Sequence, residues 1–175
     1  NLEMAVTENM LAFAERVRPE HCCLVPEKRE ELTTEGGLDV LSQEAKIKEA
    51  CMRLAELGSE ASLFIDADFS QIDAAVRCGV PGIEIRTGEY ADAMTPGSVA
   101  VELEKVRSGV EYALGQGLIV NAGHGLHYHN TQAIAAIKGI NELNIGHSMI
   151  AHSVFVGLKQ AVKEMRDLID TASAN

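Results

Sequence analysis

The segment Gly82-Ile83-Glu84-Ile85-Arg86 decides the fold class, because it places a carboxylate inside an otherwise apolar strand. The segment Leu2-Glu3-Met4-Ala5-Val6 has the same form. In an open sheet covered by helices on both faces, a carboxylate at mid-strand would be buried beneath a helix at considerable cost. In a closed barrel of parallel strands it instead points into the lumen near the mouth, where a ligand or a partner charge compensates it. The two segments therefore favour a barrel.

Four further short apolar runs are predicted as strands, and stretches with helical periodicity separate them. These runs are Cys22–Val25, Ala61–Ile65, Leu118–Asn121 and Glu142–Ile145. Alternating strands and helices imply parallel strands joined by helical crossovers. The 175 residues give about 29 residues per unit, close to one eighth of a barrel of about 250 residues. We therefore predict an α/β chain, a single domain over residues 1–175, that supplies about six units, the third to the eighth, of a (β/α)8 TIM barrel.

The predicted helices begin at capping residues and end at glycine or proline. The expected N-caps are Thr7, Ser70 and Thr95, and the expected stops are Pro19, Gly58 and Gly79. The pair Thr95-Pro96 has the form of an N-cap followed by the first helical position. An apolar stripe predicts one continuous last helix through Val154, Leu158, Ala161, Met165 and Leu168.

Composition and charge exclude several classes of function. The formal net charge of −11 disfavours a protein that binds the phosphate backbone of nucleic acid, which requires clustered Lys and Arg. The apolar runs are far shorter than the roughly 20 residues that span a bilayer, and Asn1-Leu2-Glu3 lacks the basic and apolar regions of a signal peptide. We therefore expect no nucleic-acid partner, no membrane and a cytoplasmic location. Because Asn1 precedes a strand directly, we also expect the chain to begin in mid-domain.

The four cysteines show no spacing typical of a zinc ribbon or a disulfide framework. They are Cys22, Cys23, Cys51 and Cys78. We expect four buried thiols.

Polar side chains gather at the carboxyl ends of the predicted strands, where the active sites of barrel enzymes lie. In chain order these residues are Glu3, Glu27, Asp66, Asp68, Glu84, His124 and His147. An acidic residue at a strand end often only caps the next helix or faces solvent, and Lys28 and Arg29 would neutralise Glu27. Glu3 and Glu84 are harder to explain in this way, because they lie within apolar runs.

The loop that contains His124 carries the most chemical information. Gly123 and Gly125 let the backbone turn tightly and approach a ligand, and the imidazole of His124 exchanges a proton near neutral pH. His124, His127 and His129 are alternatively a metal cluster. We favour the acid-base interpretation, because the loop contains no acidic residue to support metal-bound histidines.

The Gly146-His147 pair follows the last predicted strand and enters the last helix. Loops after the seventh and eighth strands of such barrels frequently bind phosphate through backbone N–H groups and a helix N-terminus. Gly125 and Gly146-His147 therefore lie where an anion site is expected.

Six ordered segments of the chain together resemble the pyridoxine 5′-phosphate synthase family. The segments are Asn1-Leu2-Glu3-Met4-Ala5-Val6-Thr7, Cys23-Leu24-Val25-Pro26-Glu27-Lys28-Arg29, Thr33-Thr34-Glu35-Gly36-Gly37-Leu38-Asp39, Leu63-Phe64-Ile65-Asp66-Ala67-Asp68, Val120-Asn121-Ala122-Gly123-His124-Gly125-Leu126 and Glu142-Leu143-Asn144-Ile145-Gly146-His147. The resemblance implies a barrel enzyme of vitamin B6 biosynthesis that joins 3-amino-2-oxopropyl phosphate to 1-deoxy-D-xylulose 5-phosphate and closes a pyridine ring. It further implies no metal or organic cofactor, small phosphorylated substrates and a homo-octamer.

The resemblance also implies roles for seven residues. Glu3 corresponds to a proton acceptor, His124 to a proton donor and Glu84 to a group that stabilises charged intermediates. The substrate- and phosphate-binding positions correspond to Thr33, Gly125, Gly146 and His147.

The resemblance starts at the third unit of the family's barrel, and the family's first two units carry a further catalytic histidine and phosphate-binding basic residues. One alternative is therefore a folded but inactive fragment that binds phosphate or self-associates. Another is a different phosphate-binding barrel enzyme, an isomerase or an aldolase. An aldolase would need a Schiff-base lysine, for which Lys28 is the nearest candidate.

Overall fold

A computed structural model describes residues 1–28, 31, 33 and 36–174 of the chain. Three residues of the segments that resemble the family, Arg29, Thr34 and Glu35, lie outside this part, and so does the expected neutralisation of Glu27 by Arg29. The strands are β1 (Leu2–Met4), β2 (His21–Leu24), β3 (Glu60–Ile65), β4 (Gly82–Arg86), β5 (Ile119–Gly123) and β6 (Ile140–Asn144).

Helical elements connect successive strands and continue after β6. They are α1 (Glu8–Val17), the 3₁₀ turn η2 (Leu41–Gln43), α2 (Glu44–Glu56), α3 (Phe69–Cys78), α4 (Gly88–Asp92), α5 (Pro96–Gly115), α6 (Thr131–Ala135), α7 (His147–Val156) and α8 (Leu158–Ser173). Within the described ranges no helix has the length and apolarity needed to cross a membrane.

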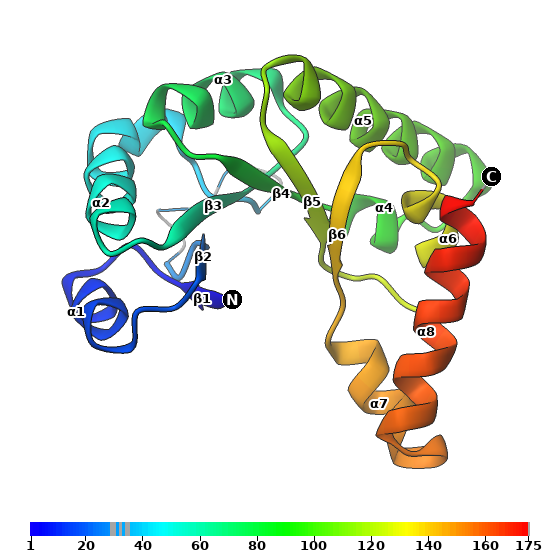
Figure 1. Ribbon diagram of the computed structural model, residues 1–175. Coiled ribbons are helices and arrows are strands. Elements are labelled where there is room, and N and C mark those ends of the chain that lie inside the picture. The colour runs from blue at the N-terminus through cyan, green and yellow to red at the C-terminus, as the bar shows by residue number, and fades with distance from the viewer. Residues whose placement is uncertain (29–30, 32, 34–35, 175) are drawn as a thin grey trace.

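The six strands form one parallel sheet in the order in which they occur along the chain. An open doubly wound sheet would reverse the strand order at some point. Figure 1 shows that the sheet curves and that helices α2, α3 and α5 lie along its outer side. The chain therefore forms six consecutive units of a (β/α)8 barrel, as the sequence predicted. In the described part of the chain β1 and β6 each pair with a strand on one side only.

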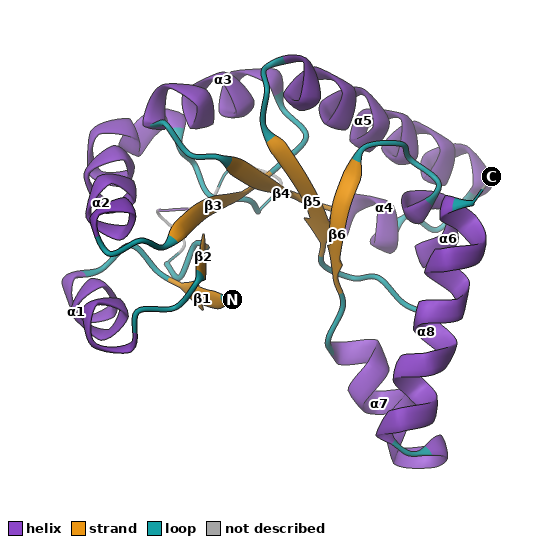
Figure 2. Ribbon diagram, in the orientation of Figure 1, coloured by secondary structure: helices purple, strands orange, loops and turns teal. Residues whose placement is uncertain are grey.

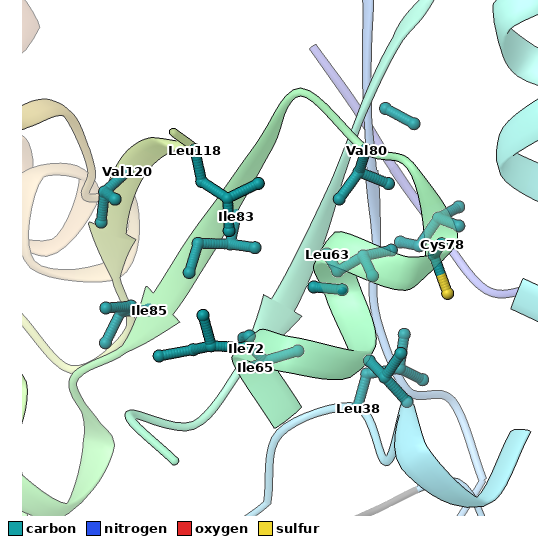
Figure 3. Packing of buried hydrophobic residues seen from close by; sticks show 14 of the residues in the cluster. Leu38, Leu63, Ile65, Ile72, Cys78, Val80, Ile83, Ile85, Leu118 and Val120 are labelled. Carbon is teal, nitrogen blue, oxygen red and sulfur yellow. The ribbon is translucent and has the colours of Figure 1, made fainter. Parts of the chain in front are cut away.

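The hydrophobic core lies between the sheet and its outer helices. Alternate residues of each strand point to opposite faces, and in the central strands the outward set consists of Leu63, Ile65, Ile83, Ile85 and Val120, all fully buried. Figure 3 shows Ile72 of α3 beside Ile65 and near Ile85. The helices cover this outer face (Figure 2), so the polar residues of the same strands face the lumen.

Most of the predicted boundaries are confirmed. Thr7 caps α1, and its side chain accepts a hydrogen bond from the backbone N–H of Met10. Thr95 caps α5 in a capping box with Ser98. The four cysteines are free thiols and buried. The strands shift by one or two residues at their ends, most visibly at β1, which ends at Met4 instead of Val6.

Two helix predictions were wrong. Asp68, not Ser70, caps α3, because its carboxylate accepts the backbone N–H groups of Ser70 at 2.9 Å and Gln71 at 3.1 Å. The expected last helix is two helices, since Gly157 adopts φ 84° and ψ 147° and interrupts the helical backbone. Val154 consequently lies on α7 and is 79% exposed, away from the core stripe to which it was assigned.

Candidate functional site

A cavity of about 920 Å³ lies at the carboxyl ends of the strands, on the lumen side of the sheet. Six of the seven predicted site residues line it: Glu3, Glu84, His124, Gly125, Gly146 and His147. They come from β1, β4, the loop after β5 and the start of α7. Residues separated by more than 100 positions therefore meet in one space, because consecutive parallel strands place their carboxyl ends along the same edge.

Glu84 occupies the centre of this arrangement and is only 4% exposed. The side-chain amide of Asn144, at the end of β6, donates a hydrogen bond of 2.7 Å to its Oε2. The thiol of Cys23, on β2, lies 3.7 Å from the same oxygen and donates to it. Glu84 is thus fixed from both sides by strands β2 and β6, with both donors on one carboxylate oxygen.

The surroundings of Glu84 favour its neutral form. Burial raises its pKa from the ordinary value of 4.5 to about 7, and the charges of Glu3 and Glu142 act in the same direction. The hydrogen bonds from Asn144 and Cys23 lower the pKa but do not cancel the effect of burial. Burial, followed by the neighbouring Glu84 charge, likewise raises the pKa of the Cys23 thiol. A buried carboxyl that titrates near neutrality is a group suited to holding or transferring a proton.

Gly123 provides the space that Glu84 occupies. A Cβ at Gly123 would overlap Oε1 of Glu84 and would lie 2.9 Å from the backbone oxygen of Asn144. Any other residue at this position would displace the carboxylate or spread β5 from β6.

His124 follows Gly123 directly and has a φ of 82°. Its imidazole is exposed, and its ring centroid lies 6.1 Å from that of Phe64, also a lining residue. Gly125 has a φ of 74°, and a Cβ there would lie 2.5 Å from the Cβ of Ala91. The glycines on both sides of His124 therefore serve the tight turn that the sequence indicated.

Gly146 is the N-cap of α7, and His147 is its first residue. The hydroxyl of Ser148 donates a hydrogen bond of 2.8 Å to the backbone oxygen of Leu126, which ties this helix start to the loop that carries His124. The free N–H groups of a first helical turn bind anions, because they point along the positive end of the helix dipole. The part of the cavity wall formed by the start of α7 is thus suited to a phosphate.

Thr33 lies apart from the other six predicted residues. It lines a second cavity, of about 440 Å³, together with Asp66, Asp68 and Lys105. Its hydroxyl donates to Oδ2 of Asp66 and accepts the backbone N–H groups of Gly36 and Gly37, each at 3.1 Å.

Arg86 lines both cavities and connects them. Its guanidinium lies 3.9 Å from the carboxylate of Asp66 and 3.1 Å from that of Glu89, and its side chain is 13% exposed. Among the residues that the structure describes, it is the only Lys or Arg that lines the larger cavity. An anionic ligand there would therefore meet one permanent cation.

A family model described as pyridoxal phosphate biosynthesis protein PdxJ matches residues 1–171. The chain belongs to the PdxJ family. This is the pyridoxine 5′-phosphate synthase family that the sequence segments resembled, and its members take part in vitamin B6 biosynthesis.

Solved structures similar to this chain share its fold at low sequence identity. GMP reductase from Trypanosoma brucei in complex with guanosine 5′-triphosphate is 15% identical with a TM-score of 0.64; the match covers 98% of this chain and 43% of that one. The Amycolatopsis orientalis BexX/CysO complex is 14% identical with a TM-score of 0.65, and the match covers 99% of this chain and 67% of that one. An HpcH/Hpal aldolase/citrate lyase family protein from Burkholderia cenocepacia J2315 is 11% identical with a TM-score of 0.57, and the match covers 98% and 76%. The chain thus spans less than half the length of the reductase.

Sequence reasoning missed three side chains that line the larger cavity or contact Glu84 in it. Arg86 could have been found, because it lies two residues after Glu84 on the same strand and therefore on the same face. Asn144 is the last residue of β6 and faces Glu84 across the gap over Gly123. Cys23 was assigned only to the core, whereas its thiol contacts Glu84.

The three histidines of the loop do not converge. The backbone N–H of His129 donates to Nδ1 of His127 at 3.2 Å, and the two rings are 5.9 Å apart. Over residues 1–28, 31, 33 and 36–174, no three His, Cys, Asp or Glu side chains are grouped as metal ligands. Lys28, the candidate for a Schiff-base lysine, is exposed and does not line either cavity.

Proposed function

We propose that this chain carries the catalytic centre of a pyridoxine 5′-phosphate synthase. The reaction joins 3-amino-2-oxopropyl phosphate to 1-deoxy-D-xylulose 5-phosphate, closes the pyridine ring and releases phosphate and water. The observation that supports it most is the cavity that combines two carboxylates, an imidazole and a helix N-terminus in a member of the PdxJ family.

The proposed chemistry needs groups that move protons without a metal or an organic cofactor. Formation of a Schiff base, shifts of double bonds and loss of water each require a proton to be taken from one atom and given to another. Glu3 is the proposed proton acceptor and His124 the proposed proton donor. Both line the same cavity, from β1 and from the loop after β5.

Glu84 is proposed to stabilise the charged intermediates. Its pKa of about 7 means that near neutral pH the carboxyl exists in both forms. A cationic intermediate bound beside it would favour the carboxylate, and loss of that positive charge would favour reprotonation. The Glu84 carboxyl can therefore lose its proton when a positive charge forms on the intermediate and regain it when that charge is lost.

The phosphate groups of the substrates are proposed to bind at Gly125, Gly146 and His147, beside the first turn of α7. Thr33 is proposed to bind substrate as well, although its hydroxyl is engaged by Asp66 in this structure. Arg86 connects the two cavities and supplies a cation to both. The proposed partners are small phosphorylated molecules and further copies of the chain.

The test is product formation from the two substrates by the wild-type protein and two histidine variants. His124→Ala should reduce the rate by a factor on the order of 10² to 10⁴, the usual contribution of one acid-base group. His129→Ala is the matched control, because His129 belongs to the same loop but does not line the cavity. Equal rates for wild type and His124→Ala would refute the assigned donor. A wild-type chain that binds substrate without forming product would support the fragment interpretation instead.

A further inference from the structure

Thr87 is the first residue after β4 and is completely buried. It lines neither cavity, so no substrate would touch it. Its backbone N–H donates to the carbonyl oxygen of Gly123 at 2.7 Å. Its hydroxyl oxygen lies 2.8 Å from the same carbonyl oxygen and 2.6 Å from that of His124. The single hydroxyl proton of Thr87 is thus shared between two consecutive carbonyl oxygens of the loop that carries His124.

This double contact depends on an unusual backbone. Consecutive carbonyls of an extended strand point to opposite edges, so one hydroxyl cannot reach both. At His124 the φ of 82° turns the chain out of the strand conformation. Both carbonyls then face Thr87.

The conformation of His124 is rare for a residue with a side chain. Among the described residues, only Arg18 shares a positive φ without being glycine, and Arg18 is the C-cap of α1, where left-handed backbone is common. Strained backbone that the surroundings hold in place occurs preferentially at functional sites. At His124 the surroundings are the two donors of Thr87, its backbone N–H and its hydroxyl, which hold the carbonyl oxygens of Gly123 and His124.

Thr87 also joins this loop to the rest of the sheet. Its carbonyl oxygen accepts the backbone N–H of Ala91 at 2.9 Å and so starts α4. Ala91 packs against the turn, since its Cβ leaves no space for a side chain at Gly125. The position of His124 is therefore set by the residue after β4 and by α4, as well as by β5, which it directly follows.

We propose that Thr87 is a positioning residue for His124. The hydroxyl of Thr87 holds the loop in the left-handed conformation that presents the imidazole of His124 to the cavity. The effect on turnover rests on the proposed function. The effect on the conformation of the loop does not, so the two are separable by experiment.

The experiment compares Thr87→Val, which replaces the hydroxyl by a methyl group of similar size, with Thr87→Ser, which keeps the hydroxyl. The His124 ring signals in ¹H–¹³C NMR spectra, assigned with His124→Gln, report the environment of the imidazole without any substrate. We expect these signals to shift or broaden in Thr87→Val and to stay in place in Thr87→Ser. Ring signals of Thr87→Val that superimpose on those of the wild type would overturn the proposal.

Turnover supplies the second readout. A catalytic group misplaced by about 1 Å costs on the order of 10²-fold in rate. We therefore expect Thr87→Val to lower kcat by roughly 10- to 100-fold with little change in KM, and Thr87→Ser to restore kcat. An unchanged kcat in Thr87→Val would contradict the proposal. A wild-type protein without activity would instead count against the proposed function and leave the NMR result to decide on Thr87.

A third comparison applies even if Thr87→Val folds poorly. Glycine adopts positive φ without strain, so His124→Gly removes the need for the hydroxyl to hold the backbone. The loss of thermal stability caused by Thr87→Val should then be smaller in the His124→Gly background than in the wild type. Equal losses in the two backgrounds would show that Thr87 stabilises the fold without regard to His124, which would refute the inference.

Discussion

The ionisation of Glu84 makes the stability of the protein depend on pH in a direction opposite to that of most carboxylates. The folded protein holds the pKa of Glu84 at about 7, against 4.5 for an ordinary glutamate. Below pH 4.5 the carboxyl is protonated in both the folded and the unfolded chain. Between these two values the unfolded chain releases the proton and the folded one keeps it, so the free energy of unfolding falls as the pH rises.

The size of the effect follows from the difference between the two pKa values. Each pKa unit corresponds to about 1.4 kcal/mol, so the full transition amounts to about 3 kcal/mol. Glu84→Gln keeps the shape of the side chain and an oxygen that accepts from Asn144, but it has no charge at any pH. Relative to the wild type, this variant should therefore gain about 2.5 kcal/mol of stability between pH 5 and pH 8.5.

The assay is urea unfolding of both proteins at a series of pH values in this range. Glu142→Gln is the control, since Glu142 is an exposed carboxylate on strand β6, two strands away from Glu84, and should show a much smaller change. A constant difference between Glu84→Gln and the wild type at all pH values would refute the buried neutral carboxyl. A difference that shrinks with rising pH would show that the Glu84 pKa is depressed.

Two substitutions and one labelling experiment test the surroundings of Glu84. Asn144→Leu removes a donor to a buried carboxylate and should destabilise the protein by about 1 to 3 kcal/mol at pH 8 and by less at pH 5. Urea unfolding measures both losses, and equal losses at the two pH values would contradict this expectation. Gly123→Ala should lower the free energy of unfolding by more than about 2 kcal/mol, because the new Cβ would overlap Glu84 and the backbone oxygen of Asn144. A melting temperature equal to that of the wild type would show that β5 and β6 accommodate the methyl group without strain. Because Cys23 is buried and its pKa is raised, its thiol should not react with a thiol reagent in the native protein at pH 8 but should react in urea. Fast labelling of Cys23 in the native protein, located by peptide mass, would contradict the burial.

The sequence allowed the barrel to be predicted because the deciding feature is local. A carboxylate among Ile83 and Ile85 is costly in one architecture and tolerated in the other, and no distant contact is needed to see this. The capping residues Thr7 and Thr95 were also found from local chemistry. The choice between Asp68 and Ser70 was missed, because both side chains can cap a helix and the sequence does not show that the extended backbone continues to Asp68.

The break at Gly157 could not be predicted from periodicity. The apolar stripe continues across it at helical spacing, and the positive φ of a glycine is permitted but not required by the sequence. The position of Thr33 depends on its hydrogen bonds with Asp66, which directly follows β3, and with Gly36 and Gly37 of its own loop. Side-chain hydrogen bonds of this kind leave no periodic signal in the sequence.

The contacts of Cys23 and Asn144 with Glu84 were missed for the same reason. A buried thiol and a strand-end amide are ordinary in sequence. They reach Glu84 only because β2 and β6 lie two strands to either side of β4 in the folded sheet. The candidate site was therefore predictable where a residue was unusual in its own segment, and unpredictable where it became functional through its neighbours.

The most direct test of the proposed active site is the position of a bound substrate. In a crystal structure of the protein with 1-deoxy-D-xylulose 5-phosphate, the phosphate should lie against Gly125, Gly146 and His147, and the carbon chain should extend between Glu3 and His124. A phosphate bound in the second cavity, beside Asp68 and Lys105, would contradict the assignment of the larger cavity as the catalytic centre.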